Sequence, residues 1–348
     1  MLTRESPNGI SSIEKGRRAK WWRRKGTKTR GFSYFAHDDR KITNAASIER
    51  IDSLVIPPAW KHVRISPAQG GKIQAVGIDT GGRLQYIYNP KYAEAQQRRK
   101  FARIETFGEH MPMLRKVTNE HISLDGFPRD KVLAIMTRLM NSLYIRMGTD
   151  RSVKHFRTYG ITTLGKKHVE IRPKGKVIFE FVGKSQKKHK KVLVDAELAA
   201  LVKQLADLGR GRKLFKYFDA EQKLRSVKPS EINAYIRSIT GDGYTAKDFR
   251  TWGASLLAAV DLAETGIADN ERLAQKNIVK MVRKVAEELG NTPSVCRSSY
   301  IHPKIIKAYA KGVTLESFTP RKLKQARRIE AEFEPEEISL LKLFKSVP

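Results

Sequence analysis

The hydrophobic pattern of this chain changes its period partway along, and that change restricts the fold more than any other feature. Between residues 31 and 88, short runs with strand-like alternation are separated by Gly70-Gly71 and Gly81-Gly82, which are typical of tight turns. Beyond residue 107 the apolar residues recur mainly at helical spacing. A strand-rich region followed by a mainly helical one predicts an α+β protein with separate domains.

The two regions are joined by a polar, basic segment at 91–107 that we expect to be helical and that contains Arg98, Arg99 and Lys100. We place the domain boundary near the middle of this segment. This gives a β-rich domain over residues 31–98 and a mostly helical domain over 99–348. Residues 1–30 are polar and basic and predict an N-terminal arm that contacts phosphates, although the pair Trp21-Trp22 argues for some packing.

Strands of the first domain are predicted at 32–35, 63–65, 73–78 and 84–88. In the last strand, Tyr86 and Tyr88 lie on one face and Arg83 and Gln85 on the other, because side chains alternate along a strand. A half-buried strand would show this alternation without binding anything. The functional alternative is a strand that presents aromatic and amide groups to nucleic-acid bases and sugars.

The second domain combines helices with a small β-hairpin sheet. Strands at 168–171 and 177–182, with 192–194 as a candidate third strand, place Lys184 on a loop at the tip of this sheet. Helices are predicted at 130–147, 196–208, 230–239, 249–262, 271–289 and 303–311, with a charged helical region at 320–345.

Three of these helix boundaries carry candidate functional residues. Arg146 is predicted at the C-terminus of helix 130–147, and Arg250 in the first turn of helix 249–262, where an anion is favoured. Gly290 is suited to end helix 271–289 in a left-handed cap, after which Asn291 lies in a turn. A short helix then begins at Pro293 and presents Tyr300 near its end, although a tyrosine there most simply packs in a core.

The charge of the chain identifies the kind of partner. Lys and Arg number 68 against 36 Asp and Glu, a net charge of +32, which favours DNA or RNA. The Lys and Arg residues lie in segments that also have apolar periodicity, so we expect a folded nucleic-acid-binding protein rather than a basic tail.

The single cysteine, Cys296, excludes a disulfide framework and a multi-cysteine zinc site. No signal peptide or membrane-spanning run is found, which predicts a cytosolic protein.

Five segments, in order and with compatible spacing, resemble type IB DNA topoisomerases, most closely the small poxviral-type and bacterial enzymes. The resemblance runs from about residue 61 to 310. The matching segments are Gly82–Tyr88, Tyr144–Gly148, Phe181–Lys184, Lys247–Gly253 and Gly290–Ser294 with Tyr300.

The resemblance implies a role for each candidate residue. Tyr300 would be the nucleophile that forms a 3′-phosphotyrosyl bond, and Lys184 the general acid that protonates the leaving 5′ oxygen. Arg146 and Arg250 would bind the non-bridging phosphate oxygens, Asn291 would add a hydrogen bond, and Lys247 would assist proton transfer.

The resemblance also implies a monomer that clamps double-stranded DNA in a bacterial nucleoid, with neither metal nor ATP. Gln85, Tyr86, Tyr88 and Arg83, together with the basic run 98–100, are its candidate DNA contacts. Poxviral enzymes carry histidine where this chain has Asn291, so a histidine-linked pH dependence is not expected. The poxviral preference for a particular pentanucleotide is not carried over either.

Two alternatives differ from this interpretation. Tyrosine recombinases use a related residue set, but their second arginine lies in a His-x-x-Arg box, which here is Lys247-x-x-Arg250. Their typical N-terminal domain is helical rather than strand-rich. The other alternative is an architectural DNA-binding protein in which Tyr300 only packs, because phosphate contacts alone give nonspecific affinity.

Overall fold

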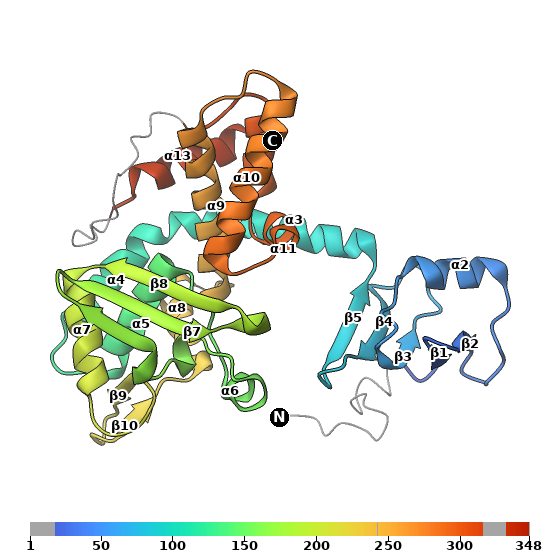
Figure 1. The fold of residues 1–348 in the computed structure, drawn as a ribbon, viewed down its shortest axis with the longest axis horizontal. Helices are drawn as coiled ribbons and strands as arrows, with labels where there is room; N and C mark the ends of the chain where they lie inside the picture. Colours follow the sequence, from blue (N-terminus) through green and yellow to red (C-terminus); the bar gives the residue numbers. More distant parts are fainter. Residues whose placement is uncertain (1–17, 242, 316–331, 348) are drawn as a thin grey trace. The chain divides into compact units, whose positions relative to one another are not determined.

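A computed structural model describes residues 18–241, 243–315 and 332–347. The chain divides into two compact units, residues 1–100 and 101–348, and the division falls inside helix α3, Pro90–Glu109. The first unit is built on a β-sheet and the second is mainly helical (Figure 1). The predicted α+β fold class is therefore confirmed.

The first unit contains one antiparallel five-stranded sheet in the order β2-β1-β3-β4-β5. Its strands are β1 Trp22–Thr27, β2 Gly31–Phe35, β3 Lys61–Ile65, β4 Ile73–Ile78 and β5 Leu84–Tyr88, and helix α2 is Ala45–Ser53. Ile51 of α2 packs with Val63, Ile65 and Ala75 in a small core. The four strands predicted from the sequence are confirmed.

The structure differs from the prediction that residues 1–30 form an arm, because β1 lies inside that range. This strand pairs with both β2 and β3, and Trp22 packs against the core. Arg24 donates hydrogen bonds to the carbonyl oxygens of Ile56, Pro57 and Trp60, so a basic residue is part of the folded unit. Residues 1–17 of the expected arm lie outside the described residues.

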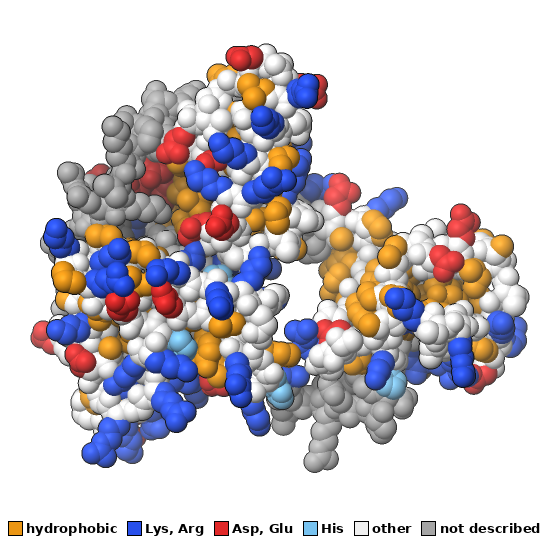
Figure 2. Space-filling model, in the orientation of Figure 1, with side chains coloured by type: hydrophobic (Ala, Val, Ile, Leu, Met, Phe, Trp, Pro, Cys, Tyr) orange, Lys and Arg blue, Asp and Glu red, His pale blue; other side chains and the backbone are white. Residues whose placement is uncertain are grey.

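In the second unit, a three-stranded antiparallel sheet has the order β6-β7-β8. The strands are β6 Val169–Arg172, β7 Lys176–Val182 and β8 Lys188–Val194, which confirms the hairpin and extends its third strand. A two-stranded sheet consists of β9 Lys216–Phe218 and β10 Leu224–Ser226. Lys and Arg side chains cover much of the visible face of this unit around the two sheets (Figure 2).

This unit also contains short 3₁₀-helices at Ile161–Thr163, Lys166–His168 and Lys184–Gln186, and its other elements are α-helices. They are α4 Met111–Ile122, α5 Arg129–Leu143, α6 Asp150–Phe156, α7 Ala196–Asp207, α8 Pro229–Thr240, α9 Ala246–Thr265, α10 Glu271–Leu289, α11 Pro293–Ser299, α12 Pro303–Ala310 and α13 Pro335–Ser346. Helix α9 contacts α5, α10, α12 and α13, and it buries Phe249, Trp252 and Leu262. Of the helical region predicted at 320–345, residues 320–331 lie outside the described residues.

The predicted position of Arg146 in a helix C-terminus is wrong. Helix α5 ends at Leu143 because Tyr144 adopts a left-handed conformation with φ of 54°. The following residues hydrogen-bond to another segment instead: the amide of Ile161 donates to the Arg146 carbonyl over 2.8 Å, and the amide of Thr162 donates to the Met147 carbonyl over 2.9 Å. Arg146 therefore lies in an irregular segment fixed by backbone pairing.

Candidate active site

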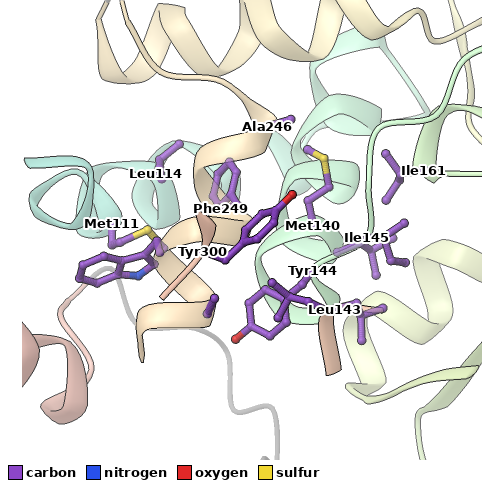
Figure 3. Close-up of a cluster of buried hydrophobic side chains, with 14 of the residues drawn as sticks. Met111, Leu114, Met140, Leu143, Tyr144, Ile145, Ile161, Ala246, Phe249 and Tyr300 are labelled. Atoms are coloured by element: carbon purple, nitrogen blue, oxygen red, sulfur yellow. The ribbon is translucent and has the colours of Figure 1, made fainter. Parts of the chain in front are cut away.

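Tyr300 lies directly after α11, where local sequence signals determine its position. The left-handed Gly290 (φ of 64°) ends α10, and the side chain of Thr292 caps α11 by accepting a hydrogen bond from the amide of Val295. Tyr300 is 6% exposed, and its ring lies among the buried side chains of the main core, close to Phe249 (Figure 3). The ring is therefore held by packing, and its hydroxyl is the part available for chemistry.

Arg146 joins Tyr300 to Asn291 through the two ends of its guanidinium group. Nη1 donates to Tyr300 Oη over 3.2 Å, and Nη2 donates to Asn291 Oδ1. A planar guanidinium suits this role because its donors are fixed relative to one another.

Arg250 is 4% exposed in the first turn of α9 and also lies near the Tyr300 ring. Nη1 donates to the Tyr144 carbonyl and Nη2 to the Leu289 carbonyl over 2.8 Å, so Arg250 ties the ends of α5 and α10 together. Its Cζ lies 5.4 Å from the centre of the Tyr300 ring. Burial, and then the charge of Arg146, lower the pKa of Arg250 to about 10, which leaves it charged near neutral pH.

Two buried donors beside Tyr300 have no acceptor among the described residues: Arg250 Nε and Asn291 Nδ2. Buried donors are normally paired, since leaving one unpaired costs free energy. An anion beside the Tyr300 hydroxyl would supply acceptors to such groups. The donor set contains guanidinium and amide groups, as expected for binding a phosphate.

The electrostatic surroundings favour the ionised form of the tyrosine. Burial raises the pKa of Tyr300, but the charges of Arg146 and Arg250 and their hydrogen bonding lower it by more, so it lies below its usual value. A phenolate is a far better nucleophile than a phenol.

The structure thus brings together Arg146, Arg250, Asn291 and Tyr300, but it leaves the two predicted lysines outside their hydrogen-bond network. Lys184 is exposed on the β7–β8 loop, as the hairpin prediction required. Lys247 is exposed in the first turn of α9. None of the hydrogen bonds of the described residues joins either lysine to the other four residues.

Sequence analysis missed His189 and Lys187. His189 lines a small pocket with Arg146 and Arg250, and its ring stacks on Phe181 with centroids 5.1 Å apart. Burial, with the nearby cations, lowers the pKa of His189 to about 4, so the imidazole is neutral near neutral pH. Extending the third predicted strand back to residue 188 would have placed His189 opposite Phe181.

The predicted DNA-contact residues of the first unit are arranged as the strand alternation requires. The Tyr86 and Tyr88 rings stack with centroids 6.0 Å apart, and Asp79 on the other side accepts hydrogen bonds from both Arg83 and Gln85. On α3, Arg98 and Arg99 are exposed and Lys100 is partly buried.

A buried tyrosine whose hydroxyl contacts one arginine, with a second buried arginine near its ring, in a basic α+β chain suits the class of enzymes that use a tyrosine on phosphodiesters. Comparison with known proteins narrows this class. Residues 89–327 match the family described as eukaryotic DNA topoisomerase I, catalytic core, and residues 31–79 match the bacterial DNA topoisomerase IB, N-terminal domain.

Individual relatives agree with these matches. The chain is 30% identical to DNA topoisomerase 1B of Acanthamoeba polyphaga mimivirus over 285 residues, which cover 80% of this chain and 84% of the relative. It is 26% identical to DNA topoisomerase 1B of Vaccinia virus (strain Copenhagen) over 238 residues, covering 67% and 71% of the two chains. The chain belongs to the type IB DNA topoisomerases, which are isomerases.

None of the helices in the described part of the chain combines the length and the apolar composition that a membrane-spanning helix needs.

Proposed function

We propose that this protein relaxes supercoiled double-stranded DNA by cutting and rejoining one strand through a covalent bond to Tyr300, without ATP or a metal ion. The observation that carries the proposal is the contact of the Tyr300 hydroxyl with Arg146, together with buried donors of Arg250 and Asn291 that find no acceptor among the described residues. A scissile phosphate placed there would meet its nucleophile and its charge-stabilising groups at the same time.

The proposed reaction conserves the energy of the phosphodiester. The Tyr300 phenolate attacks phosphorus, the bond from phosphorus to the 5′ oxygen breaks, and a 3′-phosphotyrosyl ester forms. Lys184 gives its proton to the departing 5′ oxygen, and Lys247 assists the proton transfer. Reversal by the same 5′ hydroxyl rejoins the strand, so no nucleotide hydrolysis is required.

Negative charge that develops on the phosphate would be neutralised by the protein. Arg146 and Arg250 provide fixed positive charge, and Asn291 provides a neutral donor. Two of the Arg250 donors already bind carbonyl groups. We therefore assign to the non-bridging oxygens the donors that have no partner in the described part of the chain, Arg250 Nε and Asn291 Nδ2.

DNA binding would use both units of a monomer that clamps the duplex. We assign base and sugar contacts to Gln85, Tyr86 and Tyr88, and phosphate contacts to Arg83 and the basic run 98–100. Stacked, partly exposed tyrosines suit the first role, and the exposed side chains of Arg83, Arg98 and Arg99 suit the second. The match of residues 31–79 to a bacterial domain supports action in a bacterial nucleoid.

Relaxation of negatively supercoiled plasmid in EDTA, without ATP, tests the proposal directly. We expect wild type to relax the plasmid and to form a covalent DNA adduct, and Tyr300→Phe to do neither. Tyr309→Phe is the matched control, because it also removes a buried hydroxyl, one that donates to the Gly266 carbonyl. An adduct that persists in Tyr300→Phe, or a folded wild type that binds DNA without cutting it, would contradict the proposal.

The role of Lys184 has its own test. Lys184→Ala should slow cleavage of ordinary DNA but hardly affect DNA with a 5′-bridging phosphorothiolate, whose thiolate leaves without an acid. Equal slowing on both substrates would remove Lys184 from the role of general acid.

A further inference from the structure

The loop that carries Lys184 has a defined conformation. It connects β7 to β8, and the amide of Gly183 closes it by donating to the Lys187 carbonyl over 2.7 Å. Ser185 and Gln186 both adopt left-handed conformations, with φ of 61° and 59°. Two left-handed residues in succession are the pattern of a type I′ hairpin turn, and non-glycine residues adopt it at a cost in free energy that contacts outside the loop can offset.

Two side chains of the loop provide these contacts. Gln186 Nε2 donates to the Phe156 carbonyl over 2.8 Å, and Lys187 Nζ donates to the Asn291 carbonyl over 2.7 Å. Lys187 is partly buried, whereas its neighbours Lys184 and Lys188 are exposed. Of these three lysine side chains, that of Lys187 is therefore the one held against another segment of the protein.

The carbonyl that accepts the hydrogen bond from Lys187 belongs to Asn291, a residue of the candidate active site. Asn291 is held at both ends, with its side-chain oxygen accepting from Arg146 and its carbonyl accepting from Lys187. Four residues further along the chain, Lys191 Nζ donates to a side-chain oxygen of Glu288 near the end of α10. The segment 187–191 is therefore connected to the segment 288–291 at two points.

We propose that Lys187 is a positioning residue that holds the Lys184 loop against the turn carrying Asn291. The inference rests on the proposed function and deepens it. A general acid on a five-residue loop must reach the 5′ oxygen while Tyr300 attacks the opposite side of the phosphorus. Fixing the loop to the segment that leads to Tyr300 raises the fraction of molecules in which both groups are placed for reaction.

A direct role of Lys187 in proton donation or phosphate binding predicts different behaviour from a positioning role. A positioning residue acts through Lys184, so its removal matters only where an acid is needed and only while Lys184 is present. A phosphate contact would instead affect every substrate, whatever its leaving group.

The experiment is single-turnover cleavage with enzyme in excess, on matched substrates with a 5′-bridging oxygen or sulfur. The variants of the full chain are Lys187→Met, Lys187→Arg, Lys184→Ala and the double variant Lys184→Ala/Lys187→Met. Lys188→Met is the matched control, because it removes the same charge from the adjacent, exposed position. Thermal unfolding of each variant confirms that it is folded.

We expect Lys187→Met to slow cleavage of the oxygen substrate by about 10-fold, as a modest misplacement of a reacting group does, and to leave the sulfur substrate nearly unchanged. Lys187→Arg, which keeps a charged donor, should recover most of the rate. The double variant should be no slower than Lys184→Ala alone. Lys188→Met should affect both substrates equally.

Equal slowing of both substrates by Lys187→Met, or no slowing, would overturn the inference even if Lys184→Ala discriminates between them. Additive losses in the double variant would also overturn it. Failure of the proposed function would give a different result: the wild-type protein would form no Tyr300-dependent adduct with either substrate.

Discussion

Replacing Arg146 with glutamine is expected to slow DNA cleavage and to move its pH dependence to higher pH. Arg146 donates to Tyr300 Oη over 3.2 Å and, with its other terminal nitrogen, to Asn291 Oδ1. Loss of one preorganised donor costs about 3 kcal/mol of transition-state stabilisation, which lowers the rate by about 100-fold. Glutamine has no charge and no guanidinium fork, so we expect a loss of at least this size.

The direction of the pH effect follows from the groups around Tyr300. Burial raises the pKa of Tyr300, and the charges of Arg146 and Arg250 lower it by more. Cleavage needs the phenolate, so the wild-type rate should rise with pH and level off once Tyr300 is deprotonated. Without Arg146, burial is opposed mainly by Arg250. The pKa therefore rises, and the plateau is reached at higher pH.

Single-turnover cleavage of the phosphorothiolate substrate across the neutral and alkaline range measures this effect without involving the general acid. Arg146→Lys separates charge from geometry, since it should keep much of the pH profile but lose the rate that depends on the planar fork. Arg151→Gln removes an exposed arginine of α6 and should leave the profile in place. A plateau at the wild-type pH in Arg146→Gln would refute the reasoning.

Three further predictions concern folding. Gly290→Ala and Gly126→Ala both place a side chain at positive φ, 64° and 62°, at a cost of about 1–2 kcal/mol, but of the two only the Cβ at residue 290 would clash with a neighbour, the His189 ring. Urea unfolding should therefore show the larger loss for Gly290→Ala, and equal losses would contradict the packing described. Glu337→Gln leaves Arg115 buried without its carboxylate, 2.7 Å away in the native pair. We expect a loss of about 3 kcal/mol in unfolding free energy, and a loss within the error of the measurement would count against a buried pair. The third prediction starts from burial, which lowers the pKa of His189 from 6.5 to about 4. The unfolded chain therefore binds a proton first as the pH falls, and stability should decrease between these two values. His189→Gln should reduce that slope, and an unchanged slope would exclude His189 as its source.

Elements with clear end signals were predictable from the sequence. Helix α10 has the predicted bounds, Glu271–Leu289, because Asn270 caps its start and Gly290 supplies the left-handed residue at its end. The strands that became β2 to β5 were predictable because glycine pairs separate alternating runs. These signals are local, so they do not depend on the rest of the fold.

Other features could not be predicted because they depend on partners far away in the chain. By composition the run from Trp22 to Lys25 resembles a basic arm, and only pairing with β2 and β3 makes it a strand. Helix α5 stops at Leu143 although the apolar spacing continues, because Tyr144 is left-handed and the next residues pair with Ile161 and Thr162. Composition alone contains no signal for either event.

In the candidate site, too, some features were predictable from the sequence and others were not. The four clustered residues could be identified individually, since each lies in a short motif, but the hydrogen bonds among them depend on the folded structure. Arg250 uses two donors to hold the ends of α5 and α10 together, and its Nε has no acceptor within residues 18–241, 243–315 and 332–347. A lysine at this position could not bind both carbonyls in the same plane and still direct a third donor at an anion. The buried arginine therefore builds the site and also supplies part of its binding capacity, and its loss should affect stability and cleavage together.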